Sequence, residues 1–262
     1  MLRAVIFDMD DTLLDWSKRE GNWLELNQQH LKPIHAYLVG AGHTIPDLAG
    51  MAEAYANQSR IAWEAINQRE WDCPRQEDIL RETLRALHVE PESVDIEQVQ
   101  RLFAWRLIPG VQPFDDSAEV LKALREAGVK TGLVTNAAMP MWMRDAELQE
   151  TGLLEYLDVR LTAGDVGKLK PHPEPFRVAM QRLGVTPSEA VFVGDRVQDD
   201  VAGAQLAGMR AVWVRRQSAE PFGGAFKPNA TIDTLRELFK VLDLWYPGWR
   251  KNHNHNHPDG KA

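Results

Sequence analysis

The stretch that decides the fold is VIFDMDDTLLDW, residues 5–16. Its first three residues are apolar, which is typical of a strand that is buried on both faces. Four aspartates follow within eight residues, at positions 8, 10, 11 and 15. Carboxylates this close repel one another, and an apolar core makes it costly to keep them ionised. We therefore expect either that these side chains spread into water or that a positive group lies among them.

Four further apolar runs resemble this first one in length and composition. They are KTGLVTN (130–136), DVRLTAG (158–164), AVFVGD (190–195) and RAVWVR (210–215). Helical patterns lie between or after them, at 117–128, 173–184, 199–208 and 232–244. Strands and helices that alternate at this spacing predict an α/β fold with a doubly wound, Rossmann-like parallel sheet.

The alternation is interrupted between residues 16 and 108. Helical patterns occupy this stretch, at 23–42, 48–69, 75–89 and 96–108, and no convincing strand lies among them. We therefore expect an all-helical insert at 16–108 within an α/β core formed by 1–15 and 109–246. Five tryptophans of the insert, at positions 16, 23, 63, 71 and 105, are expected to pack inside a helical bundle.

The end of the chain, 247–262, contains few apolar residues and three alternating histidines. This composition predicts a disordered tail.

Composition narrows the class of partner. The formal net charge is −8 and no dense stripe of Lys and Arg occurs, so a nucleic-acid partner is not expected. The single cysteine, Cys73, excludes an intramolecular disulfide and fits a reducing compartment. No signal-peptide pattern and no apolar run of membrane-spanning length occurs. We therefore expect a cytoplasmic protein without a membrane partner, and the sequence does not indicate its oligomeric state.

Polar side chains that suit a metal ion or a phosphate group follow the predicted strands. Ligands of open α/β sheets bind beyond the carboxyl ends of the strands. Asp8 and Asp195 end two different strands and could share one Mg²⁺, which prefers oxygen ligands. Thr135 and Lys170 could hold a phosphate through a hydroxyl group and a positive charge. An aspartate can also act as a nucleophile toward phosphorus.

Four motifs occur in order, each at a predicted strand end: DMDDT, VTN, the lysine of KPHP, and GDRVQDD. Together they resemble the motifs of the haloacid dehalogenase-like hydrolase superfamily. The resemblance covers about 1–15 and 110–245, and the helical insert resembles the superfamily's first type of cap domain, C1. It implies a phosphatase whose Mg²⁺ lies at the strand ends.

The resemblance implies a role for each matched carboxylate. Asp8 would be the nucleophile and a metal ligand. Asp10 would be the general acid and then the general base, with its backbone carbonyl on the metal. Asp195 would bind the metal directly. Asp200 is favoured as the outer partner of metal-bound water, with Asp199 as the second choice.

The resemblance also implies a phosphate site. Thr135 and Lys170 would hold the phosphoryl group, and Asn136 would add a backbone contact. Asn136 could equally cap the following helix. We expect Lys168 to be a solvated loop charge and His172 to be an ordinary surface histidine.

Three polar residues of the opening stretch have a structural explanation. We expect Asp11 and Asp15 to shape the turn after the strand, and Thr12 to form a local hydrogen bond.

Asp10 helps to choose the reaction. A halide leaves without a proton, whereas an alkoxide leaving group benefits from a positioned acid. Asp10 and the acidic cluster therefore favour Mg²⁺-dependent hydrolysis of a small phosphorylated metabolite through an aspartyl-phosphate on Asp8. The alternatives are a sugar phosphomutase with the same aspartyl chemistry and a non-catalytic binding protein. Arg60, Trp63 and Arg69 are candidates for substrate contacts from the cap.

Overall fold

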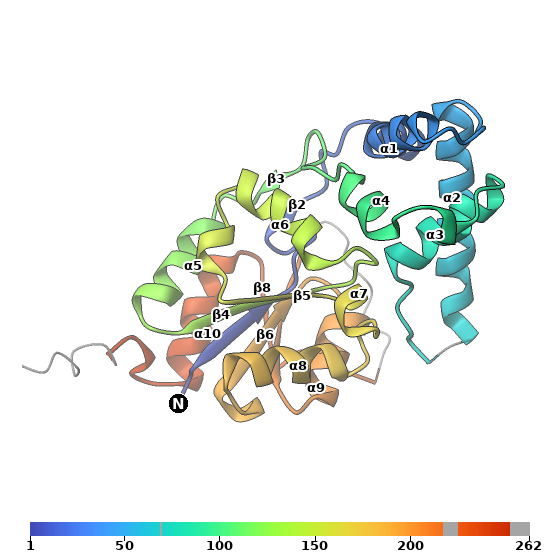
Figure 1. The fold of residues 1–262 in the computed structure, drawn as a ribbon. Coiled ribbons are helices and arrows are strands. Elements are labelled where there is room, and N and C mark those ends of the chain that lie inside the picture. The colour runs from blue at the N-terminus through green and yellow to red at the C-terminus, as the bar shows by residue number, and fades with distance from the viewer. Residues whose placement is uncertain (69, 217–224, 252–262) are drawn as a thin grey trace, which may run out of the picture.

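The larger part of the molecule is a parallel sheet with helices on both faces (Figure 1). The computed structural model describes residues 1–68, 70–216 and 225–251. The strand order is β5-β4-β1-β6-β7-β8. The strands are β1 (Ala4–Phe7), β4 (Lys130–Thr135), β5 (Val159–Thr162), β6 (Ala190–Gly194), β7 (Arg210–Val214) and β8 (Ala230–Ile232). The predicted strands and the doubly wound α/β class are thus confirmed.

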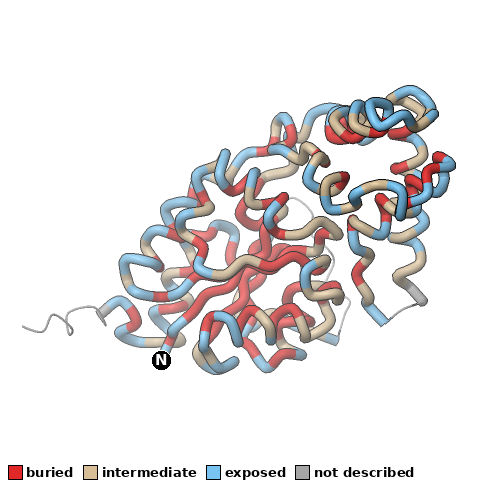
Figure 2. Tube along the Cα trace, in the orientation of Figure 1, coloured by how far each residue is buried: buried red, intermediate tan, exposed pale blue. Residues whose placement is uncertain are grey.

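Strand β1 lies at the centre of the sheet, between β4 and β6. All of its residues are fully buried, and the central strands are buried along their length (Figure 2). Val5 and Phe7 face one hydrophobic core, whereas Ala4 and Ile6 face the other. Burial on both faces explains the continuous apolar run, and each large side chain contributes about 1.5–3 kcal/mol. The carboxyl ends of β4, β1 and β6 consequently lie next to one another.

Helices cover the two faces of the sheet. The core that contains Val5 and Phe7 is completed by α5 (Ser117–Glu126), α6 (Met141–Glu150) and α10 (Leu238–Trp245). The other core is completed by α8 (Glu174–Leu183) and α9 (Ala202–Leu206), while α7 (Ala163–Val166) is a single turn after β5. Shorter helical turns are η1 (Ala65–Gln68), η2 (Pro91–Ser93), η3 (Leu154–Tyr156), η4 (Pro187–Glu189), η6 (Leu235–Glu237) and η7 (Trp249–Lys251).

A separate helical body, the cap, stands beside the sheet (Figure 1). It consists of α1 (Trp23–Gly40), α2 (Leu48–Glu64), α3 (Gln76–Ala86) and α4 (Ile96–Leu102), which enclose their own hydrophobic core. The chain enters and leaves the cap side by side, because β2 (Leu14–Asp15) pairs with β3 (Gln112–Pro113). The pairing of β2 with β3 lies beside the two boundaries that the sequence predicts, at residues 16 and 109. We therefore propose that the cap spans 16–108 and that the core is formed by 1–15 and 109–246.

Two predicted helices differ in the structure. The helix predicted at 96–108 ends at Leu102, because Phe103 adopts an extended conformation and is buried in the core of the cap. The helix predicted at 232–244 begins late, because Ile232 pairs with β7 as the last residue of β8. The prediction also missed α6, whose apolar residues are interrupted by buried charged ones.

The prediction that the tryptophans pack inside the cap is wrong for three of them, since Trp23, Trp63 and Trp71 are 49%, 37% and 48% exposed. Trp105 is partly buried and packs against the core of the cap as well as that of the sheet. Trp16 is partly buried and packs against the core of the sheet.

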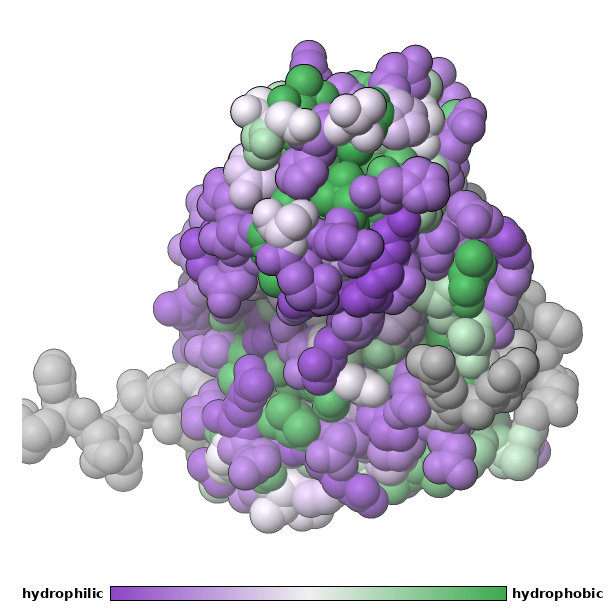
Figure 3. Space-filling model, turned by 45° about the vertical axis from the view of Figure 1, so that its right-hand side comes forward, coloured by the Kyte–Doolittle hydropathy of each residue, from purple (hydrophilic) through white to green (hydrophobic). Residues whose placement is uncertain are grey.

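Part of the stretch predicted to be a disordered tail, residues 247–251, is described by the structure and is folded. Trp249 is buried against α10 and the core, and its indole N–H donates to Asp243 at 2.8 Å. Residues 252–262, with the three histidines, lie outside the described residues. In the described part of the chain, no helix is long and apolar enough to cross a membrane. On the face shown in Figure 3, hydrophilic side chains predominate and apolar ones form small separate patches.

The crossing between cap and core depends on Gly110. Its φ is +81°, and a Cβ there would lie 1.9 Å from the carbonyl oxygen of Lys18. Gly152 has a similar φ of +70°, but a Cβ there would meet nothing within 4 Å. Gly152→Ala should cost about 1–2 kcal/mol from the left-handed backbone alone. Gly110→Ala should cost clearly more, because the backbone of Lys18 must also move. Urea unfolding of both variants measures this difference, and equal losses would contradict it.

Candidate active site

Charged and polar side chains meet at the carboxyl edge of the sheet. Asp8 directly follows β1, Asp195 directly follows β6, and Thr135 ends β4. Lys170 reaches the same place from the loop before α8. A cavity of about 400 Å³ opens here and is lined by Asp8, Asp10, Asp11, Thr135, Asn136, Lys170, Asp195, Arg196 and Asp199. Segments far apart in the sequence therefore share one pocket.

Lys170 is the positive group at the centre of this edge. Its ammonium lies 2.5 Å from Asp8 Oδ1 and 2.7 Å from Asp200 Oδ1, and it also donates to the carbonyl oxygen of Val134 at 3.0 Å. Burial alone would lower the pKa of Lys170, but the carboxylates of Asp200 and Asp8 raise it above its usual value. Lys170 therefore remains charged although it is only 3% exposed.

Asn136 holds the main chain of Lys170. Its Oδ1 accepts a hydrogen bond from the Lys170 N–H at 2.8 Å, and its Nδ2 donates to the Lys170 carbonyl at 3.1 Å. The side chain of Asn136 therefore does not cap α6. Asp165 does so instead, by accepting from the Met141 N–H at 3.2 Å. A phosphate contact from the backbone of Asn136 stays a prediction.

Three buried carboxylates can hold a metal ion together. Asp8, Asp195 and Asp200 each offer an oxygen, and these oxygens all lie within 4.8 Å of one another. Burial raises the pKa of Asp8 to about 7 and that of Asp195 to about 8, and the neighbouring carboxylates add to both shifts. A donor set of buried carboxylates fits a hard divalent cation, which would favour their ionised forms.

Asp200, and not Asp199, turns into the cluster. The chain forms a π-helical turn, η5 (Val197–Val201), in which the Asp200 and Val201 N–H groups both donate to the carbonyl of Arg196. Asp200 Oδ2 accepts from the Arg196 N–H at 3.0 Å and lies so close to Gly194 that a Cβ there would clash at 2.2 Å. Asp199 forms an ion pair with the Arg196 guanidinium at 2.7 Å.

The side chain of Asp10 is not one of the three clustered carboxylates and binds Arg144 and Thr135. Its Oδ1 lies 2.7 Å from Arg144 Nη2, and its Oδ2 lies 3.3 Å from Arg144 Nη1 and from Thr135 Oγ1. A metal contact from the backbone carbonyl of Asp10 stays a prediction. Thr12 corrects another expectation, because its hydroxyl donates to Asp195 Oδ1 at 3.4 Å and not to its own loop.

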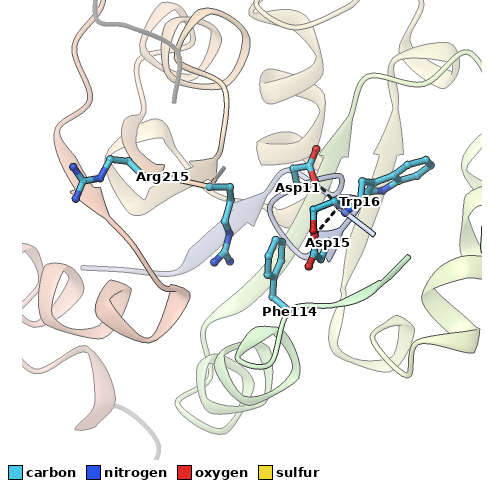
Figure 4. A pocket seen from close by; sticks show the side chains of 7 residues that line it. Asp11, Asp15, Trp16, Phe114 and Arg215 are labelled. Carbon is cyan, nitrogen blue, oxygen red and sulfur yellow. Dashed lines mark hydrogen bonds between the residues drawn. The ribbon is translucent and has the colours of Figure 1, made fainter. Parts of the chain in front are cut away.

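The other two aspartates of the opening stretch shape the turn, as predicted. Asp11 Oδ1 accepts from the Trp16 N–H at 3.1 Å, and Asp15 Oδ1 accepts from the Ser17 N–H at 2.8 Å. Figure 4 shows Asp11 and Asp15 turned toward this backbone. They lie on one wall of a second cavity, of about 520 Å³, which Phe114, Arg215 and Arg216 also line (Figure 4).

Arg144 and Glu147 were missed from the sequence. Both lie on α6, and they are 3% and 0% exposed. Arg144 Nε donates to Glu147 Oε2, so one guanidinium serves two carboxylates. A signal was present, because Arg144 lies three residues after Met141 and four before Leu148, on the apolar face of the helix.

The loop before Lys170 contacts the cap. Lys168 is partly exposed and pairs with Asp72 at 2.6 Å, so this loop charge has a partner that the sequence did not predict. Two backbone bonds flank this pair: the Leu169 N–H donates to the Trp71 carbonyl at 2.8 Å, and the Cys73 N–H donates to the Gly167 carbonyl at 3.1 Å. His172, expected at the surface without a role, accepts from the Glu174 N–H at the start of α8.

A cleft of about 660 Å³ lies between the cap and the core. Asp10, Asn136 and Arg144 line it from the core. The cap contributes aromatic and polar side chains, among them Trp23, Tyr55, Ser59, Arg60 and Trp63. Arg60 and Trp63 thus lie where the sequence analysis expected them, whereas Arg69 lies outside the described residues.

Comparison with known proteins identifies the family. The model of the haloacid dehalogenase-like hydrolases matches residues 2–208. The chain belongs to this family. It shares 32% identity with a glyceraldehyde 3-phosphate phosphatase of Methanopyrus kandleri, covering 92% of this chain and 97% of the relative. It shares 33% identity with a phosphoserine phosphatase of Thermus thermophilus, covering 91% and 98%.

Solved structures of the family have the same fold. A 2-haloacid dehalogenase of Pseudomonas syringae superposes with a TM-score of 0.62 at 30% identity, covering 94% of this chain and all of that one. A phosphatase of Thermococcus onnurineus superposes with a TM-score of 0.56 at 30% identity, covering 92% and 98%. The chain is therefore a hydrolase, and the resemblance seen in its motifs is confirmed.

The buried carboxylates make the stability of the metal-free protein depend on pH. A carboxyl whose pKa is higher in the folded chain than in the unfolded one costs stability as pH rises between the two values. Asp8 and Asp195 should therefore destabilise the fold progressively from about pH 4, their unfolded range, to about pH 7 and 8.

Asp195→Asn should remove part of this loss. In EDTA, the Tm of the variant should gain on that of the wild type as the pH rises from about 5 to about 8. Burial also lowers the pKa of His30 to about 4, so the fold loses stability as the pH falls below about 6.5. This loss is the same in the wild type and in Asp195→Asn, so it does not change the difference between their Tm values. Scanning calorimetry measures the two Tm curves, and a constant Tm difference would contradict the assignment.

Proposed function

We propose that this protein is a Mg²⁺-dependent phosphomonoester hydrolase that acts on a small phosphorylated metabolite. The observation that supports this most strongly is the buried group of Asp8, Asp195 and Asp200 beside the Lys170 ammonium. Of these four residues, Asp8, Asp195 and Lys170 line a pocket. Relatives over nearly the whole chain are named phosphatases. We expect Mg²⁺ because oxygen ligands and a phosphate group are its usual partners.

The first step transfers the phosphoryl group to Asp8. Lys170 holds Asp8 Oδ1, so Oδ2 attacks the phosphorus atom, and the bond from phosphorus to the ester oxygen breaks. Asp10, in its acid form, gives the leaving oxygen a proton. Lys170 holds the phosphoryl oxygens, and the Thr135 hydroxyl, which donates to Asp10 Oδ2 in this structure, would turn to them, because both side chains border the same pocket.

The second step returns Asp8 to its starting form. Asp10, now a carboxylate, takes a proton from a water molecule whose oxygen attacks the phosphorus. The bond between phosphorus and Asp8 breaks, and inorganic phosphate leaves. Mg²⁺ held by Asp8, Asp195 and Asp200 would reduce the repulsion between these carboxylates and the phosphate dianion.

The leaving group would occupy the cleft between the cap and the core. Asp10 and Asn136 line both this cleft and the pocket at the sheet edge, so the two cavities join at these residues. A phosphate held by Lys170 would then direct its alcohol toward Arg60 and Trp63. We therefore propose that the cap selects the substrate.

Dehalogenation is the second candidate, because a 2-haloacid dehalogenase is among the similar structures. A halide needs no proton when it leaves, and Asp10 would then have no use. Release of chloride from 2-chloropropionate, compared with release of phosphate from a panel of phosphate esters, discriminates between the two reactions. The same panel, with sugar phosphates analysed for isomerisation, tests the phosphomutase alternative.

Asp8→Asn should reduce phosphate release at least about 1,000-fold, because an amide is a poor nucleophile. EDTA should stop the wild-type reaction, and Mg²⁺ should restore it. Asp15→Asn is a matched control, since the Asp15 side chain accepts only from the Ser17 N–H among the described hydrogen bonds, and the kcat of this variant should change by less than about threefold. An active Asp8→Asn variant would exclude Asp8 as the nucleophile.

Trp63→Ala should alter substrate preference and leave the chemistry intact. Removing the ring from the cleft should raise KM about 10-fold or more for the preferred metabolite, but change kcat/KM for acetyl phosphate less than about threefold. Trp71→Ala is the control, because Trp71 is similarly exposed and does not line the cleft. Kinetics with both esters measure the effect, and an unchanged preference would exclude Trp63 from substrate selection.

A further inference from the structure

We propose that Arg144, oriented by Glu147, is a positioning residue that aims Asp10 at the ester oxygen of the substrate. This inference rests on the proposed function, since it assigns a task only if Asp10 is the acid and base of the reaction. It concerns two buried residues of α6 that contact neither Asp8 nor Lys170 in the described structure.

The contact between Arg144 and Asp10 is two-pronged. Nη2 lies 2.7 Å from Oδ1, and Nη1 lies 3.3 Å from Oδ2. A guanidinium that binds both oxygens fixes the plane of the carboxylate as well as its position. Thr135 adds a hydrogen bond to Oδ2 at 3.3 Å. Asp10 is thus the least buried member of the network, with a side chain 32% exposed, yet two side chains, those of Arg144 and Thr135, set its orientation.

Glu147 fixes the rotation of the guanidinium. It is fully buried and accepts from Arg144 Nε, which leaves both terminal nitrogens to face Asp10. The ring of Trp105, in the segment that returns from the cap, lies 5.8 Å from the guanidinium carbon. Glu147 therefore holds the guanidinium on the side opposite Asp10, and the Arg144 side chain is only 4% exposed.

Structural stability does not explain this arrangement. Burying an Arg–Glu pair costs desolvation energy that its attraction often fails to recover, and well-packed apolar side chains would do as well or better. The helix has other anchors, since Asp165 caps its start and Leu148 is buried in the core beside the sheet. A task at Asp10 accounts for two charges that packing alone would not require.

Asp10 is held at the place where an acid is needed. It lines both the pocket at the sheet edge and the cleft under the cap. The ester oxygen of a bound substrate joins the phosphoryl group to the leaving alcohol, so it must lie between these two cavities. Arg144 therefore keeps the Asp10 carboxyl at this boundary.

The leaving group provides a selective test. An alkoxide depends on the acid, whereas an acidic phenolate such as p-nitrophenolate leaves almost unaided. Asp10→Asn should lose much more activity on glycerol 3-phosphate than on p-nitrophenyl phosphate. Arg144→Met should show the same selectivity, with kcat about 10–100-fold lower on the alkyl ester and less than about fivefold lower on the aryl ester. Arg144→Lys should show nearly the same loss of kcat on the alkyl ester as Arg144→Met, because an ammonium group cannot bind both carboxylate oxygens as a guanidinium does.

Each other outcome decides against the proposal. Equal losses on both esters would show that Arg144 only supports the fold, and a change in KM alone would show that it binds substrate. If Asp10→Asn itself shows no dependence on the leaving group, the proposed role of Asp10 fails, independently of Arg144. Because Arg144→Met leaves Glu147 buried without its partner, Arg144→Met/Glu147→Met should be assayed alongside it. This double variant removes both charges, should remain folded, and should keep the selective defect.

Discussion

The contact on which the site depends is that of the Lys170 ammonium with two carboxylates, Asp8 and Asp200. In a buried environment a single carboxylate would take up a proton, and three within 4.8 Å of one another would repel strongly. One ammonium offsets part of this charge, and its own pKa rises in return. The remaining negative charge makes the same edge of the sheet suitable for a cation and, with it, for a phosphate group.

The fold supplies the means to assemble these charges. Because β1 lies between β4 and β6, residues that are more than a hundred positions apart come within hydrogen-bond distance. Asn136 then fixes the main chain of Lys170, and Thr12 reaches from the first strand end to Asp195. Each charged group is thus held by a neighbour from a different segment, which keeps the site ordered before any substrate arrives.

The sequence predicted the parts that depend on local pattern. Buried strands are continuous apolar runs, and a polar residue after each run marks the edge where ligands bind, so Asp8, Thr135 and Asp195 could be found directly. It could not choose between Asp199 and Asp200, since that choice depends on the π-helical turn of η5. Arg144 has the spacing of the apolar face of α6, but a charged residue is expected at the surface, so the burial of Arg144 and Glu147 becomes evident only from tertiary packing. The prediction that Trp23 and Trp63 are core residues was wrong for the opposite reason. They line a cleft, and an aromatic residue there has the same helical spacing as one in a core.

The cap contacts the core at several places. Among them are the crossing where β2 pairs with β3, the contact of residues 71–73 with residues 167–169, and the hydrogen bond from the Gln76 N–H to the Ala138 carbonyl at 3.0 Å. A movement of the cap that separates residues 71–73 from residues 167–169 must break main-chain hydrogen bonds beside Lys170. The position of the cap is therefore coupled, through the main chain at Leu169, to the position of the Lys170 ammonium.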